Sequence, residues 1–104
     1  MFIGLYNLDA SLYLKCQTKN SSGTPTAADT NAVTYRIYSA AGGAAILSGS
    51  YSTTVVDSQT GLYITTALTL SSANGFASGN TYLVRIAYAI SGTNYVETQY
   101  FTVT

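Results

Sequence analysis

Residues 81–103, TYLVRIAYAISGTNYVETQYFTV, give the clearest structural prediction in this chain. Two runs rich in Tyr, Val and Ile flank the segment Ser91-Gly92-Thr93-Asn94, whose residue types are typical of tight turns. Such runs joined by such a turn predict a β-hairpin. Both faces of Thr81–Ile90 carry apolar residues, which indicates a strand in the centre of its sheet.

The turn also predicts which residues of the hairpin face one another. A two-residue Gly92-Thr93 loop places glycine at the positive φ that a type II′ turn requires. The expected cross-strand pairs are Val84 with Phe101 and Tyr82 with Val103 on one surface, and Arg85 with Tyr100 on the other. A slip of one residue would mix the two surfaces. We expect the tip of the hairpin, near Tyr88 and Glu97, to project beyond the core.

The rest of the chain repeats this pattern of short strand-like runs separated by turn residues, without helical periodicity. The other expected strands are residues 2–6, 12–18, 33–39, 46–56 and 62–70. The run 46–56 contains Gly49 and many hydroxyl residues, which favours an edge strand or one that crosses between sheets. Residues 19–32 contain the only proline and are expected to form a long surface connection.

About seven strands with antiparallel hairpins predict an all-β, immunoglobulin-like or fibronectin-like antiparallel β-sandwich. The 104 residues are 47% hydrophobic and show no break in composition, so we expect residues 1–104 to form a single domain. Cys16 is the only cysteine, so an intrachain disulfide is impossible. It alternates with Leu12 and Leu14, which predicts a small core residue.

Charge is scarce and balanced, with four Lys and Arg against four Asp and Glu. The chain lacks the basic field that phosphate backbones require, which argues against a nucleic-acid partner. Neither a signal peptide nor an apolar run long enough to span a membrane is visible, so no membrane association is expected. A net charge of zero favours association with other subunits.

The chain offers few groups for catalysis or metal binding, since it has no histidine. Its carboxylates are Asp9, Asp29, Asp57 and Glu97. Asp29 and Asp57 lie among residues typical of turns, where aspartate commonly caps the backbone. No Asp-x-Asp-x-Asp spacing indicates calcium, and the hydroxyl residues lack an adjacent base. We expect no catalytic residue, no metal site and no cofactor.

The ten tyrosines are the main candidates for an interaction role. Tyr35 and Tyr82 share strand faces with core residues, whereas Tyr13, Tyr38, Tyr63, Tyr100, Arg36 and Arg85 fall on the opposite, outer parity. Strand propensity alone would also place tyrosine on a solvated face. Residues 2–6 either form the first core strand, which we favour, or lie across a partner. The interface candidates are Phe2, Tyr6, Tyr13, Arg36, Tyr38, Tyr63, Arg85 and Tyr100.

Three segments, 60–63 (TGLY), 75–86 (GFASGNTYLVRI) and 100–103 (YFTV), resemble a pattern in small virion proteins of tailed bacteriophages. The resemblance covers roughly residues 12–104, including Gly23-Thr24-Pro25. It implies an immunoglobulin-like sandwich in a virion, made in the cytoplasm of the host bacterium. In that family such domains are head decoration (cement) proteins, or modules of tails and fibres.

A small reading frame with its own Met1 and no appended domain favours a decoration subunit. Such a subunit would bind the major capsid protein and sister copies on the capsid surface and stabilise the shell. One alternative is a host- or glycan-binding module that presents residues 19–32, 71–80 and 91–95 to a sugar. Another is a tail or neck connector subunit.

Overall fold

The computed structural model describes residues 1–29 and 33–104, so residues 30–32 of the expected surface connection lie outside the described part. The described residues form an all-β structure without α-helix. The strands are β1 (Phe2–Tyr6), β2 (Ser11–Leu12), β3 (Lys15–Gln17), β4 (Thr34–Ser39), β5 (Leu47–Ser50), β6 (Leu62–Ile64), β7 (Leu68–Thr69), β8 (Thr81–Ile90) and β9 (Thr93–Val103). Two 3₁₀ turns, η1 (Val56–Ser58) and η2 (Ser72–Asn74), lie in the connections.

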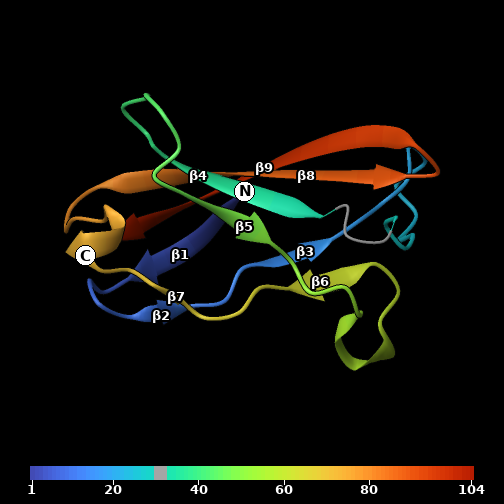
Figure 1. Ribbon diagram of the computed structural model, residues 1–104, viewed down its shortest axis with the longest axis horizontal. Helices are drawn as coiled ribbons and strands as arrows, with labels where there is room; N and C mark the ends of the chain where they lie inside the picture. Colours follow the sequence, from blue (N-terminus) through green and yellow to red (C-terminus); the bar gives the residue numbers. More distant parts are fainter. Residues whose placement is uncertain (30–32) are drawn as a thin grey trace.

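The strands form two layers (Figure 1). One layer is a five-stranded sheet in the order β1-β9-β8-β4-β5, which we call the large sheet. The other consists of two short antiparallel ribbons, β2–β7 and β3–β6. β8 lies at the centre of the large sheet and β5 at an edge, as the sequence predicts. The sheet is mixed because β1 runs parallel to β9, so the expectation of purely antiparallel pairing is wrong for β1.

The core fills the space between the two layers. The second layer contributes Leu12, Leu14 and Cys16, which alternate with exposed residues as predicted. The large sheet contributes Tyr35, Ile37, Tyr82, Val84, Ile86, Phe101 and Val103, all buried. The ring centroids of Phe76 and Tyr82 lie 4.9 Å apart, and those of Tyr82 and Phe101 lie 5.7 Å apart. Each buried apolar side chain of this size contributes roughly 1.5–3 kcal/mol to folding.

The β8–β9 hairpin turns one residue earlier than expected. Its turn residues are Ser91 and Gly92, with φ of 51° and 80°, the backbone of a type I′ turn. The observed pairs are Tyr82 with Phe101, Val84 with Gln99 and Arg85 with Thr98. The expected register is therefore shifted by two residues. A shift of two keeps each side chain on its predicted face.

Asp29 explains why Ser91 adopts a left-handed conformation that glycine would adopt more easily. One carboxylate oxygen of Asp29 accepts a hydrogen bond from the Ser91 amide (3.0 Å), and the other accepts from the Gly92 amide (3.1 Å). The aspartate thus acts as a turn cap, as expected for Asp29, but it caps a turn that is distant in sequence.

The expectation that Tyr88 and Glu97 project beyond the core is wrong. Tyr88 is buried and Glu97 is partly buried. The Tyr88 hydroxyl donates to the Lys19 carbonyl (3.2 Å) and lies 3.3 Å from Oε1 of Glu97. The connection that follows β3 covers this end of the hairpin.

The expected strand 62–70 changes face in its middle. Tyr63 and Thr65 are buried in the first half, whereas Leu68 and Leu70 are buried in the second. The change follows the end of the β3–β6 ribbon, where the Leu14 amide donates to the side chain of Thr65 (3.0 Å). Leu62 and Ile64, which alternate with Tyr63 and Thr65, are therefore only half-buried.

The expected strand 46–56 is shortened to β5. Gly49 lies opposite Tyr35, and a Cβ atom at position 49 would lie only 2.6 Å from the Tyr35 hydroxyl oxygen. Glycine therefore leaves room for the Tyr35 ring at this edge of the sheet.

Candidate protein interface on the large sheet

The outward face of the large sheet carries a row of apolar side chains across four strands. In the strand register Phe2 of β1 lies beside Tyr100 of β9, Tyr100 beside Leu83 of β8, and Leu83 beside Tyr38 of β4. The ring centroids of Phe2 and Tyr100 lie 5.2 Å apart. Phe2, Tyr100 and Leu83 are 45%, 39% and 37% exposed. We call these four residues the aromatic row.

The neighbouring level of the same face carries two opposed arginines. Arg36 of β4 lies directly opposite Arg85 of β8, and both are exposed. This level lies two residues along each strand from the aromatic row, a distance of roughly 7 Å. Like charges directly opposite on neighbouring strands destabilise a sheet, so the arginine pair lowers the stability of the isolated chain.

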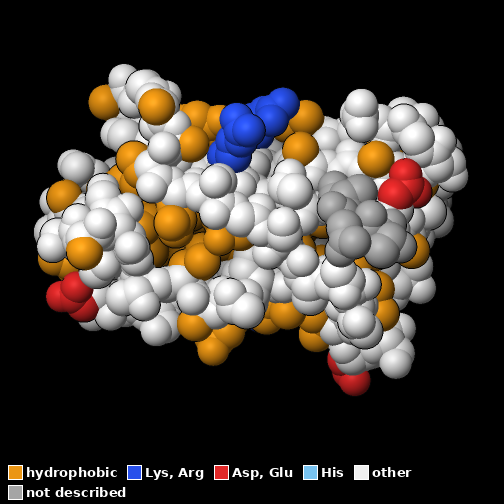
Figure 2. Space-filling view, viewed as in Figure 1, with side chains coloured by type: hydrophobic (Ala, Val, Ile, Leu, Met, Phe, Trp, Pro, Cys, Tyr) orange, Lys and Arg blue, Asp and Glu red, His pale blue; other side chains and the backbone are white. Residues whose placement is uncertain are grey.

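The carboxylates lie away from this face. Asp9 lies in the turn before β2, Asp57 in η1, and Asp29 beside the β8–β9 turn. Glu97 lies on β9, but its side chain is directed inward toward Cys16 and Tyr88. In Figure 2 the visible basic atoms gather on the β4–β8 side of the molecule, and the visible acidic atoms lie apart from them. The outward face is therefore cationic.

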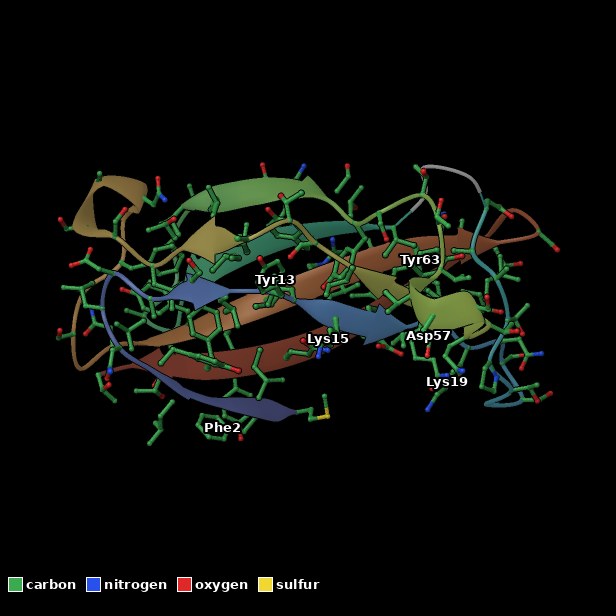
Figure 3. All side chains as sticks on the ribbon, turned by 90° about the horizontal axis from the view of Figure 1, so that it is seen from below. Phe2, Tyr13, Lys15, Lys19, Asp57 and Tyr63 are labelled. Atoms are coloured by element: carbon green, nitrogen blue, oxygen red, sulfur yellow. The ribbon has the colours of Figure 1, made fainter. Side chains whose placement is uncertain are left out.

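Five of the eight residues selected from the sequence meet on this face: Phe2, Arg36, Tyr38, Arg85 and Tyr100. Tyr13 is 53% exposed but belongs to the second layer, in the segment between β2 and β3 (Figure 3). Tyr6 is half-buried, and its hydroxyl donates to the Ile3 carbonyl (3.0 Å). The structure thus divides the selected residues between its two layers.

The expectation for Tyr63 is wrong, because its ring lies in the core and its hydroxyl accepts a hydrogen bond from the Ala28 amide (3.1 Å). Conversely, the sequence selection missed Leu83 and Val96, which are exposed on the outward face. Their alternation with the buried residues of β8 and β9 was the signal that could have identified them. Exposed apolar side chains that adjoin one another often mark a binding surface.

The buried polar groups near Cys16 form a second cluster. The Cys16 thiol lies 3.9 Å from Oε2 of Glu97. Burial, followed by the charge of Glu97 and the hydrogen bond to it, raises the pKa of Cys16 to about 12. The thiol is therefore protonated at neutral pH and does not present a nucleophilic thiolate. Within residues 1–29 and 33–104 no three potential ligand side chains gather around a possible metal position.

The loops considered for glycan binding lie at two opposite ends of the molecule (Figure 1). Residues 71–80 precede β8, and the Gly79 amide donates to the Val103 carbonyl (2.7 Å). Residues 91 and 92 follow β8 and contact Asp29. The three loops therefore do not form one surface.

In the described part of the chain, no helix has the length and apolar character needed to cross a bilayer. Comparisons of the chain with protein-family models, with curated proteins and with solved structures find no match.

Proposed function

We propose that this chain is a non-enzymatic structural protein of a tailed-phage virion. In this role it is a decoration (cement) protein that binds the major capsid shell through the outward face of its large sheet. The proposal includes an immunoglobulin-like sandwich, in which β2–β3 and β6–β7 each count as one interrupted strand, giving about seven strands. The sequence resemblance to small virion proteins suggests this role.

The observation that carries the proposal is the meeting of the aromatic row and the arginine pair on one exposed face. Aromatic residues and arginine are the types that most often dominate the energy of protein interfaces. The arginine pair also opposes the stability of the free chain. A binding partner that neutralises both guanidinium groups would remove the repulsion between them.

The charge of the face indicates the chemistry of the partner surface. A partner that presents Asp or Glu would pair with Arg36 and Arg85, because arginine forms bidentate hydrogen bonds with carboxylates. A second copy docked by the same face about a twofold axis would bring four arginines together without a carboxylate. Sister copies on the shell therefore contact one another through other surfaces.

Quantitative gel densitometry of purified particles tests the location of the protein. A decoration protein is expected at a copy number comparable to that of the major capsid protein. Removing it is expected to lower the temperature at which the capsid opens. A copy number typical of a single ring would assign the chain to the tail or neck instead, and unchanged heat resistance after removal would contradict a cement role.

A rebinding assay on stripped particles tests the proposed face. The variant R36Q/R85Q is expected to bind at least tenfold more weakly than the unchanged protein, a loss of about 1.4 kcal/mol or more. The matched control is T53E/T54E, which changes the net charge by the same amount at two exposed positions in the segment between β5 and η1. Equal weakening by both variants would show an effect of net charge alone and would contradict the proposed face.

A further inference from the structure

Strand β9 lies between β1 and β8, but β1 covers only half of its length. The register of β1 with β9 covers only Tyr100–Val103. The Tyr100 amide donates to the Met1 carbonyl (2.9 Å), and the Met1 nitrogen donates to the Thr98 carbonyl (3.1 Å). These bonds show that even-numbered residues of β9 direct their backbone groups away from β8.

The backbone groups of Asn94 and Val96 point toward the same side, beyond the end of β1. No strand of the described residues lies there. The Val96 side chain is 52% exposed, and neither Asn94 nor Thr98 is charged. A row of unpaired amides and carbonyls of this kind is a template for another strand.

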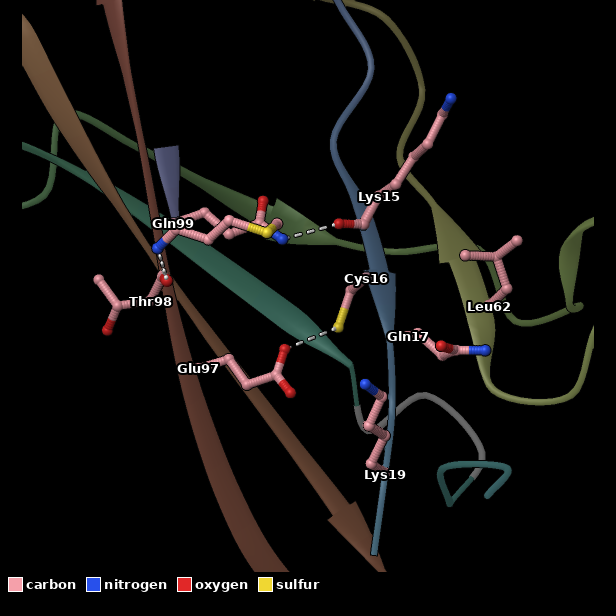
Figure 4. Close-up of a pocket in the computed structure, with 9 residues that line it drawn as sticks. Lys15, Cys16, Gln17, Lys19, Leu62, Glu97, Thr98 and Gln99 are labelled. Atoms are coloured by element: carbon pink, nitrogen blue, oxygen red, sulfur yellow. Dashed lines mark hydrogen bonds between the residues drawn. The ribbon is translucent and has the colours of Figure 1, made fainter. Parts of the chain in front are cut away.

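A hollow of about 460 Å³ opens between this half of β9 and strand β3 (Figure 4). On the β3 side, side chains already meet two backbone groups. The Lys15 carbonyl accepts from Nε2 of Gln99 (3.0 Å), and the Lys19 amide donates to the Tyr88 hydroxyl (3.3 Å). On the other side the hollow is lined by Glu97, Thr98 and Gln99 of β9, which directly follow the free Asn94–Val96 backbone.

Both lysines of the chain, Lys15 and Lys19, line this hollow and are exposed. The one carboxylate in its lining belongs to Glu97, which already contacts the Tyr88 hydroxyl (3.3 Å) and the Cys16 thiol (3.9 Å). The lining of the hollow thus carries two lysine side chains and the Met1 amino group against one partly buried carboxylate. This balance favours an anionic ligand.

We infer that the free half of β9 accepts an extended, acidic segment of a partner protein as an additional strand in line with β1. Its backbone pairs with Asn94 and Val96, and alternate side chains place carboxylates toward Lys15 and Lys19. Binding by strand addition draws its affinity from main-chain hydrogen bonds and its specificity from alternate side chains. This inference does not rest on the virion role.

A second copy of the chain fits this edge less well. The strand that a second copy would present is β9 itself, whose outward-directed residues Asn94, Val96 and Thr98 include no carboxylate that could meet Lys15 and Lys19.

The test uses the full chain and a seven-residue peptide of alternating valine and glutamate, blocked at both ends. Hydrogen exchange of single amides is followed by NMR. The peptide is expected to slow exchange of the Asn94 and Val96 amides at least tenfold, in a saturable manner. The same peptide with lysine in place of glutamate is expected to have no effect, and K15Q/K19Q is expected to weaken binding at least fivefold.

Two variants at one position separate backbone pairing from side-chain contact. V96P removes the outward amide without removing a bond to β8, so it is expected to fold, as circular dichroism can verify, but to lose peptide binding. V96A keeps the amide and is expected to bind. The inference is overturned if exchange is unchanged by peptide, if V96P binds as well as V96A, or if an N-methylated peptide binds equally. If the chain forms a dimer in the absence of peptide and V96P abolishes that dimer, the free half of β9 pairs with a second copy and not with a partner protein.

Discussion

Arg36 and Arg85 are the residues on which the proposed function depends most. They are half of the basic side chains of the chain, and the fold places them opposite each other on an exposed face. In the free protein this placement opposes stability, whereas in a complex with an acidic surface it provides charge-assisted hydrogen bonds. Replacing one arginine should therefore raise the free energy of unfolding of the isolated protein and weaken its binding to the partner.

The single variant R36E tests this opposition. It replaces a like-charge pair with an opposite-charge pair across β4 and β8, so the isolated protein is expected to gain about 0.2–1 kcal/mol in free energy of unfolding. Urea denaturation measures the gain, and the rebinding assay on stripped particles is expected to show weaker binding by the same variant. A loss of both stability and binding would indicate a structural role for Arg36.

Cys16 gives the protein a predictable response to alkali. The pKa of its thiol is raised from 9.0 to about 12 by burial and by Glu97. The unfolded chain loses this proton at lower pH than the folded chain, so the stabilising contribution is complete below pH 9.0 and declines as the pH rises toward about 12.

Urea denaturation between pH 8 and pH 11 measures the effect of Cys16. Above the ordinary thiol pKa, stability is expected to fall more steeply in the unchanged protein than in C16A, by at most about 1.4 kcal/mol per pH unit. The comparison of slopes is needed because Tyr51 and Tyr88, whose pKa values burial also raises, contribute in both proteins. Equal slopes would contradict a buried, protonated thiol.

At the scale of single elements, alternation in the sequence predicted most strands and their faces. The runs 12–18, 33–39 and 81–90 keep the predicted faces because each has one side in the core. The hairpin register was missed because the turn depends on Asp29, which is 62 positions from Ser91. The change of face within 62–70 was missed because it depends on the contact between Leu14 and Thr65, which lie 51 positions apart in the sequence.

The variant D29A tests the cap on the β8–β9 turn. It removes the acceptor for the Ser91 and Gly92 amides, and each lost hydrogen bond to a charged group costs roughly 1.5–3 kcal/mol at full burial. Because the site is exposed, a total loss of about 1–2 kcal/mol in free energy of unfolding is expected. D57N, whose side chain makes no hydrogen bond in the described structure, is the control and is expected to change stability by less than about 0.5 kcal/mol.

Two features of the whole molecule could not be predicted from the sequence. Strand β1 pairs in parallel with β9, which joins the beginning and the end of the described chain. This pairing places Phe2 beside Tyr100, and the register of β8 places Leu83 between Tyr100 and Tyr38. Parity selected Arg36, Tyr38, Arg85 and Tyr100, and the apolar N-terminal segment supplied Phe2, but only the order of the strands shows that they share one surface. The prediction that Tyr63 lies on the outer face was wrong because its strand, β6, belongs to the second layer, and contacts in that layer determine which side of β6 faces the core.

We propose that the outward face of the large sheet binds an acidic surface of a virion shell. A cryo-electron microscopy reconstruction of the particle would show which face of the protein meets the shell. We expect the face to be buried against the major capsid protein, with the guanidinium groups of Arg36 and Arg85 about 3 Å from Asp or Glu oxygens. A shell without the protein, or a bound copy whose arginine pair faces solvent, would contradict the claim.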